Sequence, residues 1–196
     1  PSLARGAIAS ILFMAFFASF MFRLTVLLQQ GEHIEPLHAG LMFAPSGVTF
    51  ALSSLFMRGW ITKNRQRAIR TGAIITIFGL AVATLGLTID KLPTVALIVA
   101  AVCLTGFGNG LALPTLIGVA LSDVPPMKAG VASGIVTAAQ QFAASAGVAL
   151  LGTLYFSRAA SVGHQHAMAW TFVVDVVLLI GVILVGGFSG HSKRKE

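Results

Sequence analysis

Two charged residues, Arg23 and Asp175, lie inside long apolar runs, where a charge is costly unless it is compensated or used. Arg23 lies seven residues before Gln30, where the first apolar run ends, and Asp175 lies seven residues after Met168, where the last run begins. If both runs are helices, each charge lies about 10 Å from the same side of the membrane. Opposite charges at one depth on neighbouring helices predict a buried ion pair. Two alternatives stay open: Asp175 binds a proton or cation, or the two side chains reach the nearby interface separately.

Three amides, Asn109, Gln140 and Gln141, fall near the middle of two further uncharged runs. A buried amide is costly unless it meets another polar group or a water-filled cavity. These side chains therefore either form hydrogen bonds between helices or line a path for a polar ligand.

Small residues crowd the same two runs. The glycines are spaced G-x-G-x-G in the first run and G-x-x-x-G in the second, and a proline lies between them; these residues are Gly106, Gly108, Gly110, Pro114, Gly130 and Gly134. No strand precedes the first glycines, which excludes a dinucleotide-binding loop. The pattern instead favours close helix packing, with a hinge as the alternative.

No combination of a nucleophile, a base and an orienting group appears, so the sequence does not indicate an enzyme. Four histidines, at positions 33, 38, 164 and 166, fall in or near loops, and their spacing does not suit a metal site. We therefore expect no metal and no cofactor. The single cysteine, Cys103, excludes an internal disulfide.

The elements that must position these residues are apolar helices. The chain is 56% hydrophobic and 10% charged, whereas an ordinary soluble domain is roughly a quarter charged. Its uncharged runs approach or exceed the roughly 20 residues that cross a bilayer as a helix. They predict an integral membrane protein of the all-α class with six transmembrane helices, over residues 6–30, 37–57, 71–89, 92–121, 129–157 and 168–187.

Basic residues cluster in short segments beside these spans, chiefly Arg58, Lys63, Arg65, Arg67 and Arg70. The net charge of +7 therefore reflects the positive-inside rule, and we expect no nucleic-acid partner. Arginines and lysines gather on the side that holds both termini, whereas Lys91 and Arg158 fall on the other side. Both termini are thus predicted to be cytoplasmic, with the basic segment against anionic lipid.

The six spans divide into two triplets of opposite orientation, as in the inverted repeats of many transporters. The third and fourth spans are joined by a short loop and should pack together. Because the repeat maps the third span to the sixth and the fourth to the first, the sixth should pack on the first.

Two runs, LLQQGEHIEPLHAGLMFAPSG (Leu27 to Gly47) and GFGNGLALPTL…VPPMKAGVASGIVTAAQQFAASAGVALLGT (Gly106 to Thr153), resemble the major facilitator superfamily. The second is similar to the late spans of its fourteen-span drug:proton antiporters, the QacA/EmrB-like group. The segment Arg58 to Gly72 keeps the basic residues of the family's inner-loop motif but lacks its acid, which puts a gating salt bridge from this loop in doubt.

The resemblance implies that residues 1–196 are the C-terminal six-helix bundle of a proton-coupled transporter. It would export small molecules, of lipophilic or cationic character, from the cell (inner) membrane by alternating access. Its partners would be the lipid bilayer, a missing N-terminal half that supplies the proton-carrying acid, a small-molecule substrate and protons. The alternatives are a six-span scaffold or sensor, an inactive truncated product, and a self-contained six-span transporter that works as a homodimer.

Overall fold

The computed structural model describes residues 2–89 and 94–187, and these residues fold into an all-helical bundle. Its elements, in chain order, are α1 (Ser2–Val26), a π-helical turn η1 (Leu27–Gly31), α2 (Pro36–Phe56), α3 (Arg58–Lys63), α4 (Arg65–Thr88), α5 (Thr94–Leu121), a 3-10 turn η2 (Pro126–Lys128), α6 (Ala129–Val162) and α7 (His164–Gly187). Within the described residues, six helices are long and apolar enough to cross a membrane, which confirms the predicted fold class.

The helices follow from the apolar runs because a backbone in hydrocarbon must satisfy its own hydrogen bonds. Pro36 occupies the first turn of α2, where its missing N–H costs nothing. Gly163 separates α6 from α7 with a φ of 83°, a conformation that glycine adopts without strain. The last two helices are therefore joined by a single residue, and both extend beyond the apolar spans.

The basic segment differs from the predicted loop, because it is helical. Arg58 to Lys63 form α3, Asn64 interrupts the helix, and α4 already begins at Arg65. Arginine, lysine, glutamine and alanine are strong helix formers, so a helix can continue into water past the end of an apolar run. The hydrophobic pattern alone did not reveal this extension.

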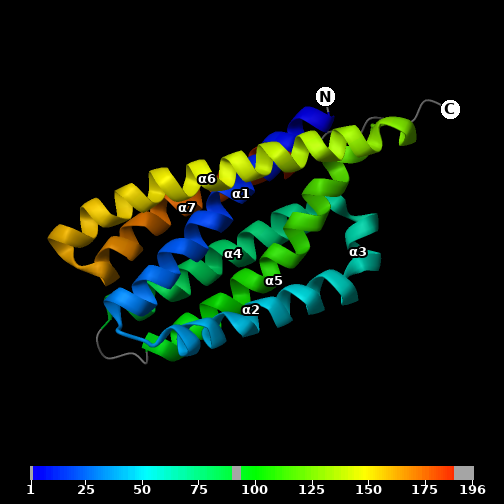
Figure 1. Ribbon diagram of the computed structural model, residues 1–196. Coiled ribbons are helices and arrows are strands. Elements are labelled where there is room, and N and C mark those ends of the chain that lie inside the picture. Colours follow the sequence, from blue (N-terminus) through cyan, green and yellow to red (C-terminus); the bar gives the residue numbers. More distant parts are fainter. Residues whose placement is uncertain (1, 90–93, 188–196) are drawn as a thin grey trace.

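The bundle has two ends. The start of α1, the short helix α3 and the connection from α5 to α6 lie together at one end, which we call the basic end (Figure 1). The α6–α7 turn and the α1–α2 connection lie at the other, which we call the α6–α7 end. The basic end holds the exposed cations of α3 and early α4, whereas Arg158 lies near the other end. Lys91, Lys193, Arg194 and Lys195 lie outside the described residues.

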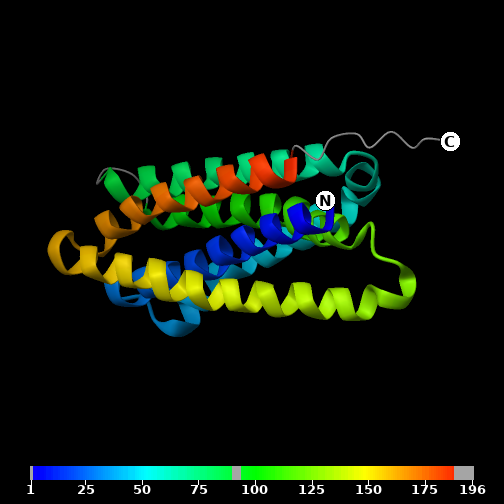
Figure 2. The same ribbon diagram turned by 90° about the horizontal axis from the view of Figure 1, so that it is seen from above.

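Helix neighbours are related as the inverted triplets predict. α4 packs on α5 and α7 packs on α1; α2 packs on α5 and α6 packs on α1. Figure 2 shows α4 and α7 side by side, with α6 at the opposite edge. The first triplet is α1, α2 and α4, and the second is α5, α6 and α7. Exchanging α1 with α5, α2 with α6 and α4 with α7 reproduces these contacts.

The core is centred on α1, where Phe13, Phe16 and Phe20 are buried and contact one another in sequence. Phe20 also contacts Phe172 of α7 at 6.1 Å between ring centroids. In contrast, α2 and α6 are the least buried of the six long helices. They carry many large exposed apolar side chains, among them Leu41, Leu55, Phe56, Val131, Ile135, Phe142 and Leu150.

Candidate functional site

Arg23 and Asp175 form an ion pair in the interior of the bundle. The Arg23 Nη2 atom donates to the Asp175 Oδ1 atom at 2.6 Å, and both side chains are fully buried. The contact exists because α7 packs on α1, as the repeat argument requires. The expected pair is therefore present, and neither side chain extends to the end of its helix.

Further hydrogen bonds orient the arginine. Its Nε atom donates to the Ser19 carbonyl oxygen at 3.0 Å, and Nη2 also lies 3.4 Å from the Ser19 Oγ atom. The serine precedes the arginine by one helical turn, so the guanidinium is folded back along α1. Arg23 Nη1 and Asp175 Oδ2 have no hydrogen-bond partner within the described part of the chain.

Asn109 lies in the contact between α4 and α5, where it is 1% exposed. Its Oδ1 atom accepts a hydrogen bond from the Thr76 hydroxyl at 3.2 Å, and the same hydroxyl lies 3.0 Å from the Gly72 carbonyl oxygen. This is the interhelical hydrogen bond that the packing alternative expects. The Nδ2 atom of Asn109 has no partner among the described residues.

Gln140 and Gln141 lie on α6, away from Asn109. Gln140 is 6% exposed and its Nε2 atom has no partner in residues 2–89 and 94–187. Gln141 is exposed. α5 packs mainly on α4, α2 and α1, whereas α6 packs on α1 and α7, so the structure does not bring the three predicted amides into one cluster.

The glycines of α5 make the predicted close contacts, with two different helices. Added Cβ atoms at Gly106 and Gly110 would clash with backbone atoms of α2, at Ser46 and Phe50. One at Gly108 would clash with the Gly72 carbonyl oxygen of α4. Positions four apart share a helix face, so glycines at alternate positions serve two neighbours.

The second glycine pair corrects the prediction. Added Cβ atoms at Gly130 or Gly134 would meet no described residue within 4 Å, so these glycines make no tight crossing with the described helices. The close approach of α6 to α1 occurs instead at Gly147, which packs against the Ala15 backbone. A G-x-x-x-G spacing shows that one helix face carries no side chains that would block close approach, but it does not show which helix packs on that face. Pro114 lies within α5 and its side chain is exposed.

Sequence reasoning missed a set of contacts at the α6–α7 end. The Tyr155 hydroxyl and the His164 Nδ1 atom are 2.8 Å apart, and Tyr155 is fully buried. Gln165 Nε2 donates to Glu32 Oε1 at 2.7 Å, which ties α7 to the residue after the π-helical turn. From the sequence, we expected His164 to lie in or near a loop, without a partner. The sequence held no signal for these contacts, because the one-residue connection at Gly163 that brings the ends of α6 and α7 together is visible only in the structure.

The five basic positions lie at the basic end, on α3 and the first turns of α4. Arg58, Lys63, Arg65 and Arg67 are exposed, and Arg70 is partly buried. Four exposed cations at one end suit a surface that contacts anionic headgroups.

Comparison with known proteins agrees with this fold. The model of the Major Facilitator Superfamily matches residues 2–148. The chain is 33% identical over 186 residues to a puromycin resistance protein of Streptomyces alboniger, covering 85% of this chain and 36% of that protein. It is 29% identical over 161 residues to a probable actinorhodin transporter of Streptomyces coelicolor, which covers 78% of this chain and 27% of that protein. A drug efflux pump of Mycobacterium tuberculosis, JefA, is 30% identical over 145 residues, which covers 74% of this chain and 28% of that protein.

Six candidate spans and a buried interhelical ion pair define the class as a polytopic membrane protein. Within that class, the chain belongs to the major facilitator superfamily, a family of transporters and not of enzymes. Its relatives include drug efflux and resistance proteins. The chain spans 27–36% of the length of the three relatives described above.

Proposed function

We propose that this chain is the C-terminal six-helix bundle of a fourteen-span, proton-driven efflux transporter. The observation that carries the proposal is the alignment of 85% of this chain with 36% of a puromycin resistance protein, within a family of transporters. A segment of this size is one bundle of a larger protein. An upstream bundle then supplies the other wall of the substrate cavity and the proton-carrying acid.

Transport proceeds by rocking of two bundles about a site near the membrane midplane. The poorly buried helices α2 and α6 offer faces for the second bundle. Gln140 and Gln141 of α6 contribute polar groups to the substrate path: the Gln140 Nε2 atom is buried and has no partner among the described residues, and the Gln141 side chain is exposed. Glycine contacts between α5 and its neighbours keep this half rigid while it rocks.

Asn109 belongs to the same path only if its Nδ2 atom becomes accessible during the cycle. In the conformation described here the residue is 1% exposed. The Arg23–Asp175 pair holds α1 against α7 and keeps their relative position during rocking. The basic end faces the cytoplasm of the cell membrane, and the α6–α7 end faces outward.

Export by cells lacking their own pumps tests the proposal. One strain produces the 196-residue chain alone, and another produces the natural protein that contains it. Accumulation of ethidium, puromycin and lincomycin is measured with and without a protonophore. Only the longer protein should lower accumulation, and the protonophore should abolish the effect, because one bundle forms only one wall of a cavity.

Gln140→Ala and Gln141→Ala, made in the longer protein, should change which compounds are exported while membrane abundance stays normal. The matched control is Ser145→Ala, another exposed polar residue of α6. Export by the 196-residue chain alone would contradict the proposal in favour of a homodimer. No export by the abundant longer protein would favour a scaffold or sensor.

A further inference from the structure

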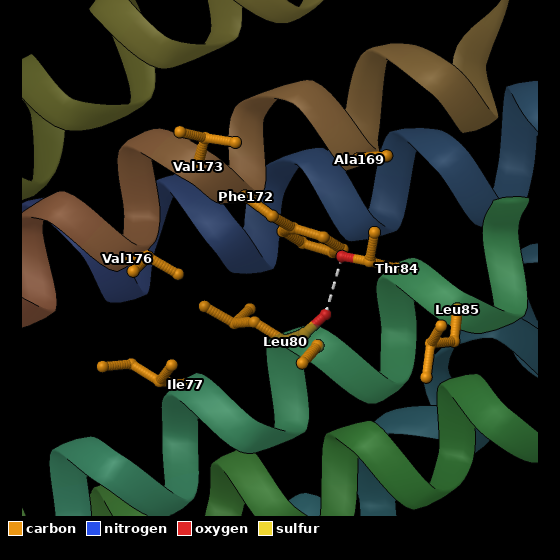
Figure 3. Close-up of a pocket in the computed structure, with 9 residues that line it drawn as sticks. Ile77, Leu80, Thr84, Leu85, Ala169, Phe172, Val173 and Val176 are labelled. Atoms are coloured by element: carbon orange, nitrogen blue, oxygen red, sulfur yellow. Dashed lines mark hydrogen bonds between the residues drawn. The ribbon is translucent and has the colours of Figure 1, made fainter.

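An apolar groove runs between α4 and α7 on the outside of the bundle (Figure 3). It has a volume of about 420 Å³. Leu80 and Phe172 are buried and form its floor, whereas Leu85 and Val173 are more than half exposed and form its rims. The surroundings of this groove in a membrane are lipid acyl chains.

The lining contains a single polar side chain, Thr84, and its hydrogen bond is already satisfied. The Thr84 hydroxyl donates to the Leu80 carbonyl oxygen at 2.9 Å, the bond drawn in Figure 3. Among the described residues, the groove therefore offers no free side-chain hydrogen-bond donor to a ligand, and it suits a hydrocarbon chain.

Toward the α6–α7 end the groove continues into a second hollow of about 270 Å³. The two hollows share Ala169 and Val173, and the second adds Thr88, His166 and Trp170. The groove, apolar except for Thr84, thus opens into a mouth with a hydroxyl, an imidazole and an indole. Tryptophan is the residue typical of the boundary between hydrocarbon and headgroups.

Trp170, which lines this mouth, carries a cation on its ring, although Arg158 itself does not line the hollow. The guanidinium carbon of Arg158 is 5.1 Å from the centroid of the Trp170 ring. The arginine is exposed, and in the described part of the chain no carboxylate lies within ion-pair distance of it. An arginine held over an aromatic ring keeps its N–H donors available for a phosphate.

The dimensions match one leaflet. Between Ile77, at the deep end, and Thr88, at the mouth, α4 rises about 16 Å, roughly half of a 30 Å hydrocarbon core. We propose that this groove binds one acyl chain of an anionic phospholipid, with the lipid phosphate held by Arg158 and His166; the Thr88 hydroxyl already donates to the Thr84 carbonyl oxygen at 2.8 Å and only marks the mouth. A cationic lipophilic compound would meet repulsion from Arg158. The proposal rests on the membrane fold and not on the proposed transport activity.

Photo-crosslinking in nanodiscs tests the site. A benzophenone amino acid replaces Leu85 in the groove or, as the control, Ile74, an α4 residue of similar exposure outside the groove. The natural protein is reconstituted in equal phosphatidylglycerol and phosphatidylcholine with matched chains. Crosslinks at position 85 should favour phosphatidylglycerol about fivefold, the effect of one cation on an anionic headgroup. Crosslinks at position 74 should show no preference.

Two test substitutions, each with a control, distinguish binding of the lipid headgroup from binding of the acyl chain. Arg158→Gln should abolish the preference at position 85, while Arg65→Gln, an exposed cation at the basic end, should leave it intact. Ala81→Phe fills the groove and should lower total crosslinking at position 85, while Ala138→Phe on the exposed face of α6 should not. If Ala81→Phe does not yield folded protein, Ala169→Leu fills the groove from α7.

Equal crosslinking of the two lipids at position 85 would overturn the proposal, as would a preference that survives Arg158→Gln. Unchanged crosslinking in the filled groove would show that no acyl chain enters it. Loss of the lipid crosslink on adding glycerol 3-phosphate at the lipid concentration would show that the mouth binds free phosphate, and would also overturn it.

Discussion

Arg23 and Asp175 place opposite charges in the contact between α1 and α7, where each offsets part of the other's desolvation cost. Isolated charges in hydrocarbon are costly, and pairing offsets part of that cost only when geometry is good. Here the closest approach is 2.6 Å and Ser19 holds the guanidinium in place. One nitrogen and one carboxylate oxygen stay without partners, so the pair is sensitive to loss of either member.

Asp175→Asn and Arg23→Gln should each destabilise the protein by about 3–5 kcal/mol, because each leaves an uncompensated buried group. The exchange Arg23→Asp with Asp175→Arg should recover part of the loss. Folded protein after detergent extraction and its thermal unfolding midpoint measure both effects. If Asp175→Asn keeps normal abundance but abolishes proton-driven export, the aspartate is a coupling residue and not a structural partner.

The Thr76–Asn109 hydrogen bond should contribute less to the free energy of unfolding than the ion pair does. Interhelical hydrogen bonds in membrane proteins are worth about 0.6 kcal/mol on average. A double-mutant cycle with Thr76→Val and Asn109→Ala should therefore give a coupling of about that size in unfolding experiments. Thr105→Val, which removes a hydroxyl that donates to the Val102 carbonyl oxygen of its own helix, is the control. Additive effects of the two substitutions would show that the hydrogen bond contributes nothing.

At the scale of elements, α5 is held by small residues on two of its faces. Gly106 and Gly110 admit the backbone of α2, and Gly108 admits the backbone of α4. Gly72 of α4 returns the contact, since an added Cβ there would meet the Gly108 carbonyl oxygen. Such close approach replaces the hydrophobic driving force, which is absent between helices in lipid.

Gly108→Ala should cost about 1–3 kcal/mol, because its methyl group would meet backbone atoms that cannot move aside. Gly134→Ala should be neutral or stabilising, since an added Cβ would meet no described residue within 4 Å and alanine is the better helix former. Thermal unfolding of the two variants measures the difference. A large loss at Gly134 would instead indicate that this exposed face packs on another bundle.

At the scale of the whole molecule, the arrangement of charges separates the two ends. Exposed cations gather on α3 and early α4, whereas the α6–α7 end carries Arg158 and the Glu32–Gln165 contact. Loops rich in arginine and lysine stay in the cytoplasm during insertion. The fold thus has a predicted direction in the membrane.

Single cysteines at Glu32 and Asn64, introduced after replacing Cys103 with serine, test that direction. An impermeant thiol reagent added to intact cells should label position 32 and not position 64. Both should react after the cells are permeabilised, which controls for burial. Labelling of position 64 alone in intact cells would reverse the orientation.

Much of the architecture could be read from the sequence. Six apolar runs specify six helices because a chain in hydrocarbon has few other ways to satisfy its backbone. Short connections and inverted triplets then predicted that the last helix packs on the first, and matching depths predicted the pair of Arg23 and Asp175. These inferences need only length, depth and connectivity, which are local properties of a chain in a layer of known thickness.

Only the tertiary structure decided what each helix face meets. Asn109 and Gln140 are equally polar in the sequence, yet one is bonded to Thr76 and the other lies on a different helix. Gly108 and Gly134 both belong to glycine patterns that favour close helix packing, yet the first is crowded and the second is open among the described residues. The link between Tyr155 and His164 and the groove between α4 and α7 had no sequence signal. The reason is that the contacts of a side chain depend on the rotation of its helix and on partners distant in sequence, and composition records neither.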